Sequence, residues 1–148
     1  MRALIQRVES AEVTVSGERI ASIARGLLVF VGIHRDDGPQ DGEKLIKKIL
    51  ALRIFEDDLG KMGRSVSDIK GELLIVSQFT LFGELSKGTR PDFSASMNGD
   101  DARFFFSAWM LKLRASTNLK IEEGQFGAHM KVQLVNDGPV TLMLDTRA

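Results

Sequence analysis

Hydrophobic and polar residues alternate along the first part of the chain with the period of two that is typical of half-buried β-strands. A continuous apolar run then follows, which is typical of a central strand buried on both faces. The segments with these patterns are Ala3–Val8, Glu12–Val15, the stretch around Ile20 and Ile23, and Leu27–Val31. With a turn signal at Ser16-Gly17-Glu18, they predict a meander of three or four strands that ends at Gly32.

Two later segments have the spacing of helices. From Asp41 to about Phe55, apolar residues recur on one side and lysines occupy the other, so we expect an amphipathic helix with Asp41 as its N-cap. The lysine face is typical of a solvated surface, with a nucleic-acid contact as the alternative. A second helix, capped by Asp100-Asp101, is expected to end near Ala115. Its aromatic residues cover more than one face, which indicates burial in the core or at a subunit contact.

A buried strand is predicted at Leu73–Val76, and polar residues follow it directly: Ser77, Gln78 and Thr80. An apolar strand that ends in polar side chains resembles the floor of a site, although an ordinary strand entering a loop has the same pattern. The polar stretch Glu84–Gly99 comes next and contains Lys87 and Arg90. So long a loop is either functional, as in a phosphate or nucleotide contact, or simply solvated.

Alternation returns at Met130–Val135 and at Val140–Leu144, and the segment Asn136-Asp137-Gly138-Pro139 is expected to break the two strands apart. No repeat or linker divides the chain. The fold class predicted is α/β (α+β-like): a single compact domain, residues 1–148, with a mixed, mainly antiparallel sheet or barrel and two main helices.

Composition narrows the function classes. The 148 residues are 43% hydrophobic and 27% charged, with 20 basic and 20 acidic residues, so neither a disordered chain nor a protein that holds DNA by net charge is indicated. The absence of cysteine removes disulfides, thiolate metal sites and a cysteine nucleophile. No apolar run approaches the length of a membrane span, so we expect no membrane partner and a cytoplasmic location.

The side chains alone give a weak case for a conventional nucleophilic enzyme. Ser77 and His129 are a possible hydrolytic pair, but neither lies in a Gly-x-Ser-x-Gly elbow, and Thr80 has no evident base. His34 near two aspartates is a weak metal signal, and no metal or cofactor is expected. Catalysis would then rely on backbone amides at a strand end, Phe79-Thr80, or on a group of the substrate.

Two motifs bring the chain close to a known family. Ser77-Gln78-Phe79-Thr80-Leu81, followed by Asn136-Asp137-Gly138-Pro139-Val140-Thr141, resembles the D-aminoacyl-tRNA deacylase family. The likeness also includes Arg53–Asp57, Gly60–Met62, Lys87-Gly88-x-Arg90-Pro91 and Gly127-Ala128-x-Met130. The chain departs from the family pattern at Phe82-Gly83, where Tyr-Ala is frequent, and at His129. These departures bear on substrate preference more than on the reaction.

The resemblance implies a homodimer that hydrolyses the ester of D-aminoacyl-tRNA, and of glycine mischarged on alanine tRNA. Ser77, Gln78, Phe79 and Thr80 would form the catalytic segment, and Thr80 would be either a nucleophile or a lining residue. Gly138 and Pro139 of the other subunit, joined by a cis peptide bond, would reject L-amino acids. Two alternatives stay open: a sister deacylase that removes a small misattached L-amino acid, and a non-catalytic tRNA-binding module.

Overall fold

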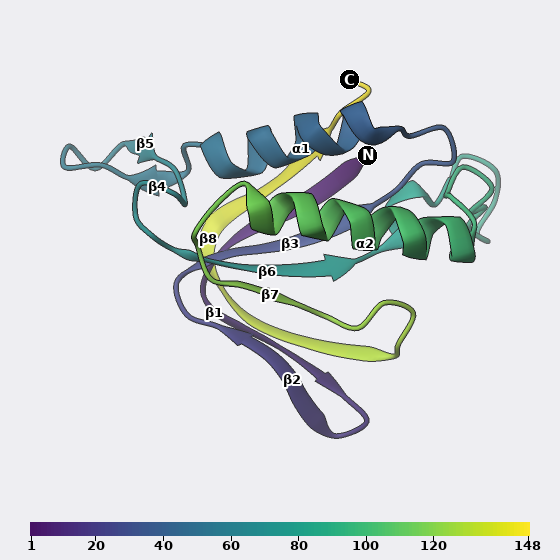
Figure 1. The fold of residues 1–148 in the computed structure, drawn as a ribbon, viewed down its shortest axis with the longest axis horizontal. Helices are drawn as coiled ribbons and strands as arrows, with labels where there is room; N and C mark the ends of the chain where they lie inside the picture. Colours follow the sequence, from purple (N-terminus) through teal and green to yellow (C-terminus); the bar gives the residue numbers. More distant parts are fainter.

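Eight strands, two α-helices and one short 3-10 helix make up the computed structural model, which describes residues 1–148 (Figure 1). In chain order the elements are β1 (Arg2–Val15), β2 (Glu18–Ile23), β3 (Gly26–Gly32), α1 (Pro39–Ala51), β4 (Phe55–Glu56), β5 (Met62–Arg64), β6 (Glu72–Ser77), the 3-10 helix η1 (Phe79–Phe82), α2 (Gly99–Ala115), β7 (Ile121–Glu123) and β8 (Met130–Asp145).

Strand β1 is the centre of the sheet. Its first half pairs with β3, its second half pairs with β2, and β8 runs antiparallel along both halves. The two segments predicted at the N-terminus are therefore one strand, and β3 returns to β1 rather than to β2. The predicted meander is wrong in this respect, because the pairing depends on residues far apart in sequence. The sheet order is β2-β1-β3-β6-β7, with β8 on β1.

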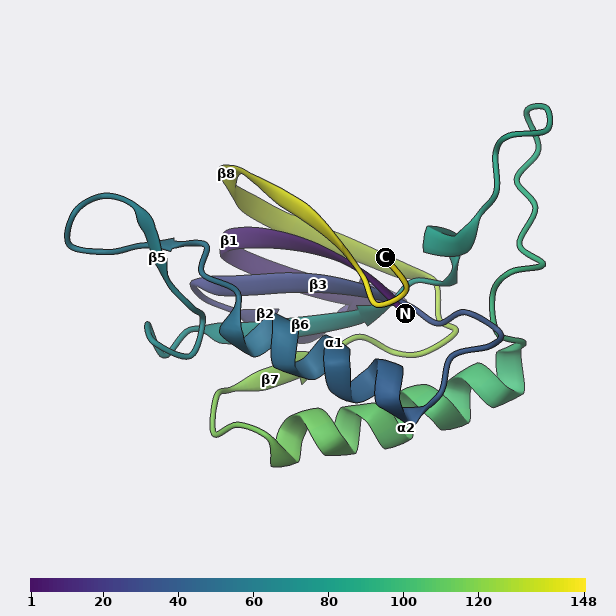
Figure 2. The same cartoon turned by 90° about the horizontal axis from the view of Figure 1, so that it is seen from above.

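Strands β3, β6 and β7 are parallel, and the two helices that connect them lie on one face of the sheet (Figures 1 and 2). Leu27, Leu73 and Ile75 face the core beneath these helices. Leu28 and Leu74 face a second core, which is closed by the curled β1–β2 hairpin. This burial on both faces confirms that the apolar runs are central strands, and the curling gives the sheet the barrel-like form that was predicted.

The predicted helix starts need correction. Helix α1 begins after an N-cap at Gly38, and Asp41 is its third residue, whose carboxylate accepts from the Gly38 backbone N–H at 3.0 Å. Pro39 suits the first helical position because its missing N–H would be unbonded there. Asn98, not the aspartates, caps α2 by accepting from the Asp101 backbone N–H at 3.1 Å. Helix α1 ends at Ala51, before the expected Phe55.

The C-terminal strands also differ from the prediction. β8 is continuous through the segment expected to break it, because the extra residues leave the ladder as a bulge opposite Arg7. The expected polar loop between α1 and β6 contains the short β4–β5 hairpin, and β7 was not predicted. The single domain, its two helices and its mainly antiparallel sheet are as predicted. No helix has the length and hydrophobicity that crossing a bilayer requires.

Candidate active site

The candidate site begins where β6 ends. Ser77 is its last residue, and the Gln78 backbone N–H still donates to the Val31 carbonyl at 2.8 Å. The chain then turns into η1 instead of continuing as a strand, so the expected strand end at Phe79-Thr80 is a 3-10 turn. Neither the Phe79 nor the Thr80 backbone N–H has a hydrogen-bond partner within the chain, as is usual in a first helical turn.

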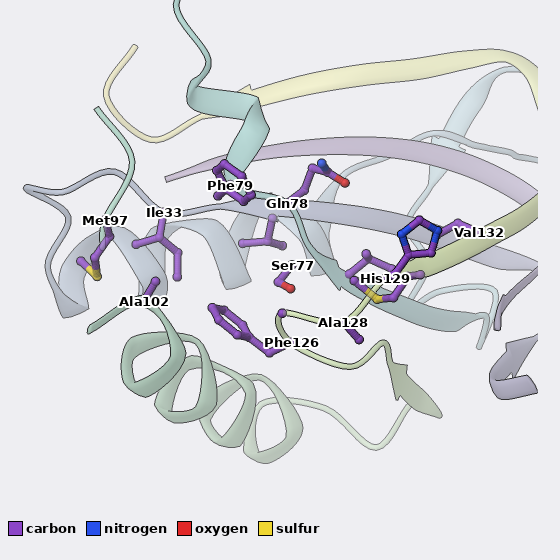
Figure 3. A pocket seen from close by; sticks show the side chains of 14 residues that line it. Ile33, Ser77, Gln78, Phe79, Met97, Ala102, Phe126, Ala128, His129 and Val132 are labelled. Carbon is purple, nitrogen blue, oxygen red and sulfur yellow. The ribbon is translucent and has the colours of Figure 1, made fainter. Parts of the chain in front are cut away.

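A cavity of about 340 Å³ opens beside this turn (Figure 3). Three segments form it: the ends of β3 and β6, the start of α2 with the residue before its cap, and the loop that leads into β8. Most of its lining is apolar, and Phe126 and Ala128 face Ser77 across it. The lining residues are Val31, Ile33, Val76, Ser77, Gln78, Phe79, Met97, Ala102, Phe126, Gly127, Ala128, His129, Met130 and Val132.

The predicted catalytic segment is only partly in the cavity lining. Ser77, Gln78 and Phe79 line it, whereas Thr80 lies outside it and is exposed. The Gln78 side-chain amide donates a hydrogen bond to the Thr80 hydroxyl oxygen and so connects the two residues. His129 lines the cavity too, but no aspartate or glutamate does. A Ser-His-Asp arrangement therefore lacks the acid that would orient the histidine.

Gly138 and Pro139 lie in the β8 bulge, are both exposed and do not line the cavity. The peptide bond between them is cis. Arg7, opposite the bulge on β1, holds it in place. Its guanidinium contacts the Asp137 carboxylate at 3.0 Å and donates to the Ile54 carbonyl at 2.7 Å. The Asn136 side-chain amide closes the base of the bulge by donating to the Arg7 and Val140 carbonyls at 3.0 and 3.1 Å.

The strand register separates the two predicted motifs within one chain. Residues that are paired from strand to strand form a row across the sheet. Ser77 pairs with Val31, and the row that contains them ends at Leu144 in β8. The bulge lies next to the row that contains Val8 and ends at Glu72. These rows are five residues apart along β6, which corresponds to about 17 Å at a rise of about 3.3 Å per residue. The structure of one chain does not bring the two motifs together.

Several lining residues were not found by sequence reasoning. Met97 lies just before α2 and Ala102 lies in its first turn. Phe126 lies in the loop between β7 and β8, and Val132 lies near the start of β8. Their apolar side chains carry no chemical signal. Only the motif Gly127-Ala128-x-Met130, which belonged to the family resemblance, indicated this wall of the cavity.

The remaining candidates lie at the edges of the site. His34 packs against Phe82 with ring centroids 5.2 Å apart, and its Nδ1 accepts from the Asp36 backbone N–H at 3.1 Å. No group of three or more His, Asp or Glu side chains is arranged to hold a metal ion. The site residues thus offer a mostly apolar cavity, two unbonded backbone amides, and the hydroxyls of Ser77 and Thr80.

The loop after η1 forms an arm, residues 84–92, that projects from the body of the domain (Figure 2). Glu84 and Asp92 pair at its base through two backbone hydrogen bonds of 2.8 and 3.0 Å. The Ser86 and Ser94 backbone N–H groups donate to these carboxylates and lower the pKa of each. Lys87 and Arg90 are exposed on the arm.

Comparison with known proteins gives this site its context. The family model described as D-Tyr-tRNA(Tyr) deacylase matches residues 4–145. The chain belongs to this family. The predicted resemblance is thereby confirmed, and the chain is an enzyme of the hydrolase class.

Similar proteins agree with this assignment. A D-aminoacyl-tRNA deacylase of Thermosipho melanesiensis is 51% identical over 99% of this chain and 98% of its own length. One of Chloroherpeton thalassium is 51% identical over 99% and 96%. A solved structure described as "c-Myc DNA Unwinding Element Binding Protein" superimposes with a TM-score of 0.94 at 44% identity, covering 98% of each chain. Another, described as "Structural Analysis of a probable eukaryotic D-amino acid tRNA deacylase", has a TM-score of 0.83 at 17% identity and covers 97% of each chain, which supports the fold.

Proposed function

We propose that the chain hydrolyses the ester between a D-amino acid, or glycine, and the 3′-terminal adenosine of tRNA, and that it works as a homodimer. The observation that carries the proposal is the apolar cavity of about 340 Å³ beside two unbonded backbone amides, in a chain of the D-Tyr-tRNA(Tyr) deacylase family. A cavity of this size and lining is suited to the adenine and ribose of the terminal nucleoside. The aminoacyl ester then lies at the mouth of the cavity, against Ser77–Thr80.

The chemistry proposed needs oriented donors more than a strong base. Water attacks the ester carbonyl carbon, the bond to the ribose oxygen breaks, and the free amino acid and tRNA leave. The Phe79 and Thr80 backbone N–H groups are unbonded and available to the oxyanion that forms during the attack. The vicinal ribose hydroxyl is close to the ester in any aminoacyl-tRNA and assists the water. This pathway agrees with a cavity that contains no aspartate or glutamate.

Thr80 is assigned to the mouth of the site and not to covalent catalysis. Its hydroxyl oxygen accepts from the Gln78 amide, and that amide cannot remove a proton. An activated threonine nucleophile needs an adjacent base. The Thr80 hydroxyl keeps its own proton free to donate to the substrate.

The selectivity for D-amino acids is assigned to Gly138-Pro139 of the second subunit. The bulge is exposed and firmly held by Arg7 and Asn136, so it can enter a neighbouring cavity without losing its shape. The exposed apolar residues Val135, Leu142 and Met143 flank it on β8, an edge strand that pairs only with β1, which supports a contact with a second copy. Carbonyl oxygens of the bulge would accept from the substrate ammonium and leave no space for an L side chain.

The test is the hydrolysis of D-tyrosyl-tRNA and L-tyrosyl-tRNA by the same preparation. The proposal expects cleavage of the D ester with at least a hundredfold preference in kcat/KM, equivalent to about 2.7 kcal/mol. Equal cleavage of both esters, or preference for the L form, would refute the chiral assignment. Binding of uncharged tRNA without cleavage of either ester would support a non-catalytic tRNA-binding module instead.

A further inference from the structure

A second hollow continues from the candidate active site. It has a volume of about 620 Å³ and lies between η1, the base of the projecting arm and the start of α2. It shares Phe79, Met97, Ala102, Phe126 and Gly127 with the cavity, so a ligand can pass from one to the other without leaving the surface. We call it the adjoining groove. Six of the residues that line it are not part of the cavity, and these six include Phe93, Asp100 and Arg103.

The adjoining groove presents aromatic rings to solvent. Phe79 is 57% exposed and Phe93 is 37% exposed, and their rings pack edge to face with centroids 5.1 Å apart. Exposed phenyl rings at the edge of a nucleoside-sized cavity are typical of surfaces on which single-stranded nucleic acids stack their bases. The Ser96 hydroxyl donates to the Phe79 carbonyl at 3.0 Å, which fixes the backbone that carries the Phe79 ring.

Gly83 is the reason that Phe93 reaches this position. A Cβ atom at Gly83 would lie 2.9 Å from the Phe93 ring, closer than side chains pack. The backbone of Gly83 has φ −62° and ψ 122°, which any residue can adopt. The glycine is therefore needed for the space it leaves and not for its backbone conformation. An alanine there would displace the ring, and its Cβ atom would also lie 3.1 Å from the Thr80 carbonyl oxygen.

The two charged side chains of the groove, those of Asp100 and Arg103, form no ion pair. Arg103 is exposed, and its guanidinium lies over the Phe126 ring at 4.9 Å from the centroid. A guanidinium placed in this way can contact a phosphate while its flat face stays on the ring. Asp100 repels a phosphate, but its carboxylate is a suitable acceptor for the exocyclic amino group of cytosine. The groove thus offers a stacking surface, one cation and one acceptor.

We propose that the adjoining groove binds the cytidine that precedes the terminal adenosine of tRNA, with its base on Phe79 and Phe93 and its phosphate near Arg103. The inference rests on the proposed function, since it assumes that the cavity takes the terminal adenosine. All tRNA ends carry cytidine at this position, so the contact adds affinity for tRNA without selecting one tRNA over another.

Two non-cleavable ligands test the inference without using hydrolysis. Both carry D-tyrosine in amide linkage to 3′-amino-3′-deoxyadenosine, and one has a cytidine joined through a 5′ phosphate. Calorimetric titration of the wild-type protein should give about tenfold tighter binding of the longer ligand, within the range that one stacked base contributes. In the Phe93→Ala variant this advantage should fall to less than about threefold. The cytidine would then contribute less than about 0.7 kcal/mol of binding free energy.

Three further variants sharpen the test. Gly83→Ala should reduce the advantage as Phe93→Ala does, because it displaces the same ring, and Phe93→Tyr should preserve it. Phe104→Ala is the matched control, because it removes a phenyl ring that is 80% exposed on α2 but outside the groove. Thermal unfolding of each variant checks that it is folded.

The outcomes separate this inference from the proposed function. Equal affinity of the wild type for both ligands, or an advantage that survives both Phe93→Ala and Gly83→Ala, overturns the cytidine site. No binding of either ligand overturns it as well, because the cavity would not take adenosine. Tighter binding of the longer ligand, lost in the Phe93→Ala variant, supports the site even if D-tyrosyl-tRNA is not hydrolysed, in which case only the proposed function fails.

Discussion

Replacing Arg7 by methionine should loosen the β8 bulge and destabilise the domain. The guanidinium donates to the Ile54 carbonyl at 2.7 Å at a buried site, and without it that carbonyl loses its donor, which costs about 1–3 kcal/mol. The Asp137 side chain is 37% exposed, so water can solvate it and the lost ion pair adds at most about 1 kcal/mol. The methionine side chain retains most of the apolar packing of the arginine stem. We expect a total loss of about 3 kcal/mol, or about 6–12 °C in Tm for a chain of this size.

The assay is urea and thermal unfolding at one fixed protein concentration, followed by hydrolysis of D- and L-tyrosyl-tRNA below the transition. Because Gly138 and Pro139 are held by the same contacts, the ratio of kcat/KM for the D and L esters should also fall, by about tenfold or more. Arg19→Met is the control: its ion pair with Glu12 is long, at 3.5 Å, and exposed, so a change of less than about 0.5 kcal/mol is expected. An Arg7→Met protein as stable and as selective as the wild type would refute the view that Arg7 holds the bulge.

Three other predictions concern the site and the pH range. Thr80→Ala should keep kcat within about tenfold of the wild type, and a far larger loss would favour a covalent threonine. Pro139→Gly should raise the hydrolysis of L-tyrosyl-tRNA, because a bulge without the proline would no longer hold the carbonyl oxygens of the proposed filter in place; unchanged selectivity in steady-state kinetics would contradict this. The Gly38 backbone N–H lowers the pKa of Asp41 below its ordinary value of 3.8, so the ionised carboxylate stabilises the fold above that pH and this contribution is lost as the pH falls further. Asp41→Asn should therefore lower the free energy of unfolding at about pH 7 and lower it less at about pH 3. An equal loss at both pH values would contradict the assignment.

Local sequence patterns predicted the strands and helices better than they predicted which strands pair with each other. The alternation in β1 and the apolar runs of β3 and β6 identified these strands because burial is visible in a short window. The pairing of β1 with β8 joins opposite ends of the chain, so no local pattern could show that β1 is continuous. Helix α1 was found but its start was not, because Gly38 is an N-cap without a side chain.

The candidate site was predictable in its polar part and hidden in its apolar part. Ser77 and Gln78 stood out because polar residues directly follow a buried strand. Phe126 and Ala102 look like ordinary core residues, and only the tertiary structure shows that they enclose a cavity. The role proposed for Gly138-Pro139 requires a second copy of the chain, and a local sequence pattern carries no information about contacts between subunits.

Complementation between two inactive variants tests most directly the claim that one site uses two subunits. Ala102→Phe fills the cavity from a residue in its wall, and Gly138→Trp adds a bulky group to the tip of the bulge. If the bulge enters the cavity of the partner, each variant alone should hydrolyse D-tyrosyl-tRNA poorly. An equimolar mixture, refolded together, should recover about one quarter of wild-type activity, because half of the dimers are mixed and each has one intact site. No recovery on mixing, or full activity of Gly138→Trp alone, would contradict the two-subunit site.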